Sequence, residues 1–143
     1  MALALGDLKS DVSQWVYERF RAMFPSATLT FENAPFDPVA GSQWARLSVF
    51  VDAVDPSELS PGPGGWRAFG TLILQLFQPY RQGTYPTDRM AWELLRTLRL
   101  GTGPTGVSFH GLGGAAARVE TVGADGPWYQ QNLVVPFYAN GGL

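Results

Sequence analysis

Three spaced glycines are the first residues in this sequence that suggest chemistry. Residues 101–106 read Gly-Thr-Gly-Pro-Thr-Gly, which matches the dinucleotide-binding pattern. In that pattern the glycines follow a strand and open a helix, so that free backbone N–H groups meet a pyrophosphate. Here the motif follows an expected helix and precedes an expected strand, and Pro104 lacks an N–H donor. The motif is more typical of a helix stop and a loop, so we expect no cofactor.

Two further pairs have residue types that catalysis uses. Ser108 and His110 lie on one face of an expected strand, but a triad also needs an orienting acid and an oxyanion hole. Asp52 and Asp55 could divide general acid and base roles, yet acids at a strand exit more often bond turn amides. His110 is the only histidine and there is no cysteine, which excludes multi-histidine and thiolate metal sites. We therefore predict a protein that is not an enzyme, with no catalytic, cofactor-binding or metal-binding residues.

The composition indicates a single domain with an unusually uncharged surface. The chain has 143 residues, of which 45% are hydrophobic and 15% charged. Soluble domains usually have about 25% charged residues, so part of this surface is expected to be covered by other protein. The net charge is −2 without a basic cluster, which argues against gripping a nucleic-acid backbone. No apolar run approaches the ~20 residues needed to span a bilayer, so we expect no membrane partner.

Apolar spacing predicts two helices and six strands. Helices are expected at 7–24, with Asp7 capping the start, and from Thr87 to about residue 100. The expected strands are 28–32, 44–54, 66–78, 106–110, 115–122 and 128–137. The order is one helix, three strands, one helix and three strands, without an internal repeat or a domain boundary. The segment 55–65 contains three prolines, which predicts a long irregular loop that contacts a partner.

Two of the expected strands have apolar residues on both faces. In strand 44–54, Ala45 to Ala53 alternate on one face, and Trp44 to Asp52 alternate on the other. Strand 66–78 places three leucines, Leu72 to Leu76, opposite Phe69 and Phe77, so it should lie centrally in its sheet. We expect the helices to cover part of the second face.

Aromatic and arginine residues are the best candidates for contacts with other proteins. Nine of the ten basic residues are arginine, and Phe, Trp and Tyr make up 13% of the chain. Arginine and aromatic side chains are enriched in protein interfaces, where lysine is depleted. The candidate contacts with neighbouring subunits or a partner are Trp44, Arg46, Phe50, Glu58, Trp66, Phe69, Phe77, Trp128 and Tyr129.

Several segments, in their order and spacing, carry a recognisable pattern. Gly70-Thr-Leu-Ile-Leu-Gln-Leu-Phe-Gln-Pro79 precedes a Gly-bearing loop and an amphipathic helix, and Trp128 to Phe137 forms a closing strand. Phe36-Asp-Pro38 comes before the alternating strand that starts at Trp44. From about residue 8 to residue 138 the chain resembles the tail terminator family of long-tailed phages. The segments 55–65 and 111–114 do not match that family residue by residue.

The resemblance implies an α+β fold, with a mixed or mainly antiparallel sheet packed against two helices. It also implies a virion structural protein that forms a homohexameric ring in the tail or neck, assembled in the host cytoplasm. Such a ring caps the tail tube, ends tail polymerisation and joins the tube to a head-side connector or stopper protein. DNA would pass through the lumen without specific binding. The alternatives are another neck component, a tail-tube subunit, or a small monomeric enzyme or ligand-binding domain.

Overall fold

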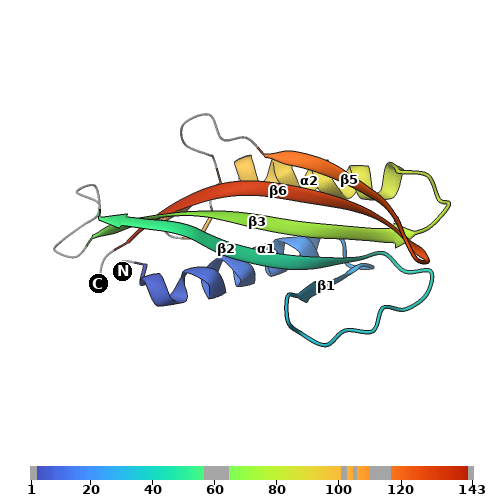
Figure 1. Cartoon of the computed structure of the whole chain (residues 1–143), viewed down its shortest axis with the longest axis horizontal. Helices are drawn as coiled ribbons and strands as arrows, with labels where there is room; N and C mark the ends of the chain where they lie inside the picture. The colour runs from blue at the N-terminus through green and yellow to red at the C-terminus, as the bar shows by residue number, and fades with distance from the viewer. Residues whose placement is uncertain (1–2, 57–64, 101–102, 105, 110–116, 142–143) are drawn as a thin grey trace.

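The chain folds into one α+β domain in which two helices pack on a six-stranded, mostly antiparallel sheet (Figure 1). The computed structural model describes residues 3–56, 65–100, 103–104, 106–109 and 117–141. The helical elements are η1 (Leu5–Asp7), α1 (Leu8–Met23) and α2 (Tyr85–Leu100). The strands are β1 (Thr28–Phe31), β2 (Trp44–Pro56), β3 (Trp66–Pro79), β4 (Val107–Ser108), β5 (Arg118–Asp125) and β6 (Trp128–Gly141).

The sheet is built around β3, which pairs with β2 on one side and with β6 on the other. This central position confirms the expectation from its two apolar faces. Strand β1 lies parallel to the start of β2, while the other pairings are antiparallel. The outer side of β6 is shared, because β5 pairs with residues 128–134 and β4 with residues 138–139.

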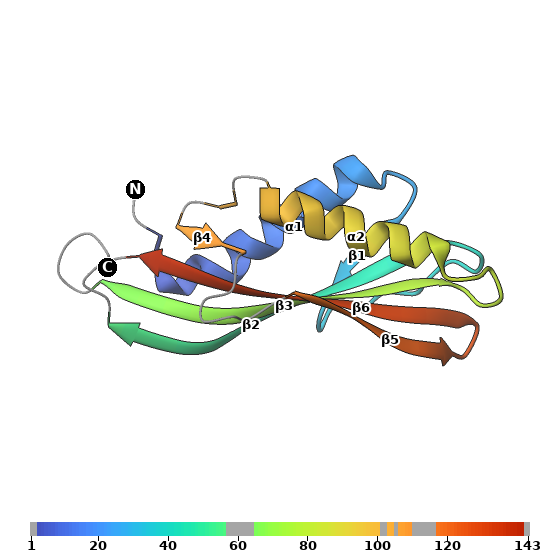
Figure 2. The same cartoon turned by 90° about the horizontal axis from the view of Figure 1, so that it is seen from above.

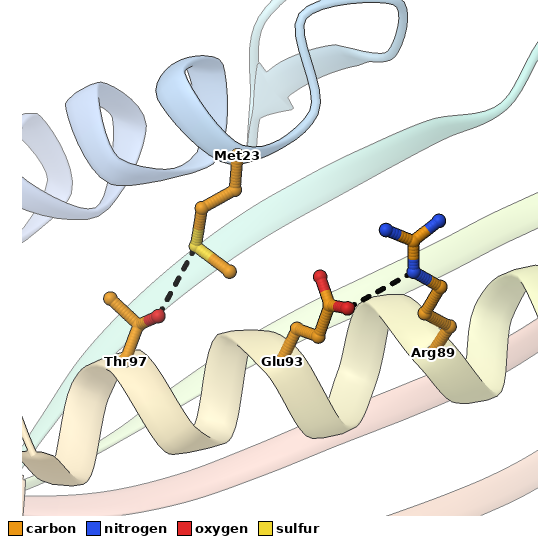
Figure 3. Close-up of polar contacts among 4 residues, drawn as sticks. All are labelled: Met23, Arg89, Glu93 and Thr97. Atoms are coloured by element: carbon orange, nitrogen blue, oxygen red, sulfur yellow. Dashed lines mark hydrogen bonds and ion pairs between the residues drawn. The ribbon is translucent and has the colours of Figure 1, made fainter.

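Both helices lie on the same face of the sheet (Figure 2). One continuous core joins the apolar side of α1, that of α2 and the leucine face of β3. Leu74 is fully buried at its centre, beside Leu47 and Leu133 in the sheet register. A further contact joins the two helices directly: the Thr97 hydroxyl donates a 3.3 Å hydrogen bond to the Met23 sulfur (Figure 3). The expectation that helices cover part of the second sheet face is therefore wrong.

Two local details differ from the sequence-based expectations. Asp7 precedes α1 but makes no side-chain capping hydrogen bond. As the last residue of η1 it has φ −97° and ψ −5°, whereas a capping side chain needs an extended backbone to reach the first turn. In β2 a bulge between Val51 and Ala53 shifts the register, so Ala53 pairs with Phe69 and is exposed instead of continuing the core face.

A buried glutamine ties the strand β3 to the start of α2. The Gln78 side chain is fully buried; its amide donates to the Gly83 carbonyl, and its oxygen accepts a 3.0 Å bond from the Thr87 N–H. The helix begins at Tyr85, two residues before the expected start, with Pro86 in a first-turn position that needs no N–H. The N–H groups of a first helical turn lack partners within the helix, so Gln78 caps α2 from outside it.

Replacing Gln78 by leucine should destabilise the protein by about 1–3 kcal/mol, because a buried N–H and a carbonyl would each lose a partner. Urea unfolding of the variant and the parent protein measures this difference. Gln75→Leu is the matched control: Gln75 lies on the same strand but on the opposite, partly exposed face. Equal losses in the two variants would show that Gln78 does not act as a cap.

Candidate interface on the uncovered face of the sheet

The face of the sheet that points away from the helices, here called the open face, is the candidate site (Figure 2). Strand register brings its residues into rows across β2, β3 and β6. The central rows are Arg46–Gln75–Asn132, Ser48–Ile73–Val134 and Phe50–Thr71–Pro136. These rows mix apolar, amide and charged side chains, and most of them are half-buried. Such a mixture is typical of protein-binding surfaces.

An aromatic cluster closes one end of the open face. The rings of Trp44 and Phe77 stack with centroids 4.0 Å apart, and Trp128 meets Trp44 edge-on at 5.9 Å. Phe36, from the connection between β1 and β2, packs against Trp44 at 5.2 Å. Together these contacts leave Trp44 and Phe77 only 4% exposed. This end of the face is therefore packed within the chain itself.

The opposite end of the open face carries exposed acids and an aromatic ring. Phe50 is 39% exposed, and Asp52 and Asp55 are exposed beyond it along β2. The Thr71 hydroxyl donates a 2.8 Å hydrogen bond to the carboxylate of Asp52, which orients that group. Because of the bulge in β2, Asp55 pairs with Arg67 on the open face instead of continuing the core face.

Arg67 occupies the same end but is already engaged within the chain. Its Nε donates a 2.8 Å bond to the Asn140 side-chain oxygen, and its guanidinium lies 5.5 Å from the centre of the Tyr138 ring. These contacts orient the Arg67 side chain between Asn140 and Tyr138. Both partners of Arg67 are uncharged, so Asp52, Asp55 and Arg67 together carry a net charge of −1 at this end.

Between the two ends the open face is hollowed. A depression of ≈ 510 Å³ is lined by Phe50 and Ile73, by the amides Gln75 and Asn132, and by Glu32 and Arg46. The guanidinium of Arg46 lies 5.4 Å from the Trp44 ring centre, on the aromatic side of the hollow. Apolar residues with polar groups around them suit a large amphipathic side chain from a partner.

The structure separates the candidate contact residues into three groups. Trp44, Trp66 and Phe77 are buried, with Trp66 in the core on the helix side, so these three do not offer free surface in the folded chain. The side chains that remain accessible are Arg46, Phe50, Phe69, Trp128 and Tyr129. Glu58 lies outside the described residues, as does most of the predicted loop 55–65.

The structure describes only some of the residues that were considered for chemistry. The glycine motif lies between the end of α2 and the start of β4, and the Val107 N–H bonds the Pro104 carbonyl in a turn there. Ser108 is half-buried in β4, while His110 lies outside the described residues. Among the residues that are described, no three His, Cys, Asp or Glu side chains gather as metal ligands. No described helix is long and apolar enough to cross a membrane.

Sequence reasoning missed a row of exposed side chains on α2, here called the α2 stripe. It consists of Tyr85, Arg89, Trp92, Arg96 and Arg99, which are all exposed. Tyr85 is 72% and Trp92 57% exposed, large values for aromatic rings. Their spacing of four, three, four and three residues puts them on one side of a helix, opposite the buried Met90, Leu94 and Leu98. This spacing is visible in the sequence, but the buried residues Met90, Leu94 and Leu98 give the stronger helical pattern.

One ion pair adjoins the α2 stripe. Arg89 and Glu93 are one helical turn apart, and the Arg89 Nε lies 3.0 Å from a carboxylate oxygen of Glu93 (Figure 3). The hydrogen bond that the Arg89 guanidinium donates to the Glu93 carboxylate raises the pKa of Arg89. The ion pairs recorded among the described residues join Arg89 to Glu93 and Arg118 to Glu120, so Arg96 and Arg99 have no such partner there. Within the described part of the chain, two arginines without an ion-pair partner and a tryptophan therefore face solvent on α2.

Comparison with known proteins supports the fold alone. No family model matches the chain, and no curated protein matches it in sequence. Solved structures match it in fold; one of them has a TM-score of 0.66 at 14% sequence identity, over 96% of each chain. At that identity the likeness shows a shared arrangement of helices and strands.

Proposed function

We propose that the protein is a structural component of a phage tail, which assembles into a closed ring on the end of the tail tube and stops its growth. The observation that carries this proposal is the open face, a long sheet surface that neither helix covers. It presents Phe50 and Arg46 at a hollow and the accessible Phe69 elsewhere on the same face, and these residue types are favoured in interfaces between proteins.

Two independent features support the proposal. The order of segments from about residue 8 to residue 138 resembles the tail terminator family, which implies two helices packed on a mixed or mainly antiparallel sheet. The chain has this fold. In addition, the α2 stripe gives the helix layer its own aromatic and basic surface. A subunit with different contact surfaces on its two sides is suited to head-to-tail association, which closes a ring when the rotation per subunit allows.

The mechanism is steric and needs no catalysis. One side of the ring binds the last tube subunits and blocks further addition, while the other side receives a head-side connector or stopper protein. DNA passes through the lumen, where a neutral or acidic lining would not hold its phosphates. The ring forms in the host cytoplasm and remains in the neck of the finished virion.

The test combines the mass of the purified protein with its effect on tube growth. We expect light scattering to give a closed hexamer and negative-stain images to show rings. Added to polymerising tube subunits, the protein should shorten and cap the tubes. A protein that stays monomeric at every concentration and leaves tube length unchanged would contradict the proposal. Filaments formed by the protein alone would instead favour a tail-tube subunit.

A further inference from the structure

We propose that the α2 stripe of one copy docks on the open face of the next copy and forms the contact that closes the ring. This inference rests on the proposed function and specifies how its subunits join. The two surfaces lie on opposite sides of the molecule, the stripe beyond the helix layer and the open face beyond the sheet (Figure 2). Contacts between unlike surfaces on opposite sides are heterologous, and such contacts generate a ring when the rotation per subunit closes.

Shape supports this pairing. Trp92 projects from α2 with 57% of its surface exposed, and the open face has a hollow of ≈ 510 Å³ with Phe50 and Ile73 in its lining. An indole that enters this hollow buries its ring against these two side chains. Its N–H can donate to an oxygen of Gln75 or Asn132, which line the same hollow.

Charge fixes the direction of the helix on the sheet. The stripe carries Arg96 and Arg99 after Trp92, and the open face carries Asp52 and Asp55 after Phe50. With its C-terminal end towards these acids, α2 runs in the same direction as β2. The reverse orientation would carry Arg96 and Arg99 past the guanidinium of Arg46, on the other side of the hollow. In the proposed orientation Arg89 lies towards Arg46 instead, and Glu93 pairs with its charge.

The spacing of the charged residues agrees with that direction. Seven residues of helix separate Trp92 from Arg99, a rise of about 10 Å. Four residues of strand separate Ser48, at the hollow, from Asp52, a distance of about 13 Å. The remaining gap is shorter than an extended arginine side chain. With Trp92 in the hollow, the guanidinium of Arg99 therefore reaches the carboxylate of Asp52, which Thr71 already orients.

Complementary charge reversal tests the contact. The first variant carries Arg96→Glu and Arg99→Glu, and the second carries Asp52→Arg and Asp55→Arg. Every changed residue is exposed in the monomer, so both variants should fold. Each variant alone should place like charges against each other and weaken ring assembly by about 30-fold or more in apparent dissociation constant. Mixed one to one, they should form rings in which the two variants alternate, because each reversed surface then meets its complement.

The control variant carries Arg19→Glu and Arg21→Glu, the same change of charge on exposed positions of α1. It should form normal rings. Native mass spectrometry counts the two variants in each ring, and circular dichroism checks the fold. Normal rings from either reversed variant alone, or a mixture that stays monomeric, would overturn this interface.

The same experiment separates this contact from its rivals. A parent protein that never forms rings and never caps tubes removes the proposed function, whereas normal rings from the reversed variants remove only the proposed contact. Fluorescence anisotropy with duplex DNA provides the last comparison. Duplex binding that is lost in the Arg96 and Arg99 variant, while its rings stay normal, would assign the α2 stripe to nucleic acid and overturn the proposal.

Discussion

Leu74→Ala should destabilise the protein by about 2–5 kcal/mol, through lost apolar burial and the cavity left behind. Leu74 is fully buried at the centre of β3, with Leu47 and Leu133 beside it in the adjacent strands. The helices pack on this face, so the surrounding atoms have little freedom to collapse into the space. The measurement is the free energy of unfolding in urea.

Ile73→Ala is the matched control for the core substitution. Ile73 is the neighbouring residue on β3, but its side chain lies half-buried on the open face. Its truncation should cost clearly less in the isolated subunit, because the lost atoms are already partly in contact with water. A loss at Leu74 no larger than that at Ile73 would contradict the assignment of the two faces.

Gly70→Val should be at least as damaging, at about 3 kcal/mol or more. A Cβ atom at Gly70 would collide with the Phe137 ring on β6 and with the backbone carbonyl of Phe50 on β2. The ring could turn away, but the carbonyl belongs to the paired strand and cannot move without disturbing the ladder. The midpoint of thermal or urea unfolding measures the loss.

Gly6→Ala provides the comparison for Gly70. A Cβ at Gly6 would meet no atom within 4 Å, and the residue has no positive φ. This substitution should leave stability nearly unchanged. Similar losses of stability at both glycines would contradict the explanation that the close packing of β2, β3 and β6 requires a glycine at position 70.

Local patterns in the sequence predicted most of the elements, because alternation and helical spacing are properties of short segments. Strand β3 was expected at 66–78 and spans Trp66–Pro79, since its apolar alternation is uninterrupted. The two helices also lie close to their expected ranges. Strand β5 was expected at 115–122 but spans Arg118–Asp125, because its outer residues are polar and give a weak pattern.

The features that the sequence did not reveal depend on contacts between distant residues. Both helices proved to share one face of the sheet, which no local pattern specifies. Trp44 was expected at an interface, yet Phe36 and Trp128 pack around its ring within the chain. Gln78 caps a helix that begins seven residues later, so its role appears only once the turn between them is known.

The sheet cannot be completed before its last strand has been synthesised. Strand β6 spans residues 128–141, yet it pairs with β3 along the whole length of both strands and also holds β4 and β5. A nascent chain that still lacks these residues leaves the edge of β3 and much of the leucine face exposed. Domains generally fold as units during synthesis, so this one must wait for its C-terminal part. Chains that end before β6 would therefore be unable to form this sheet.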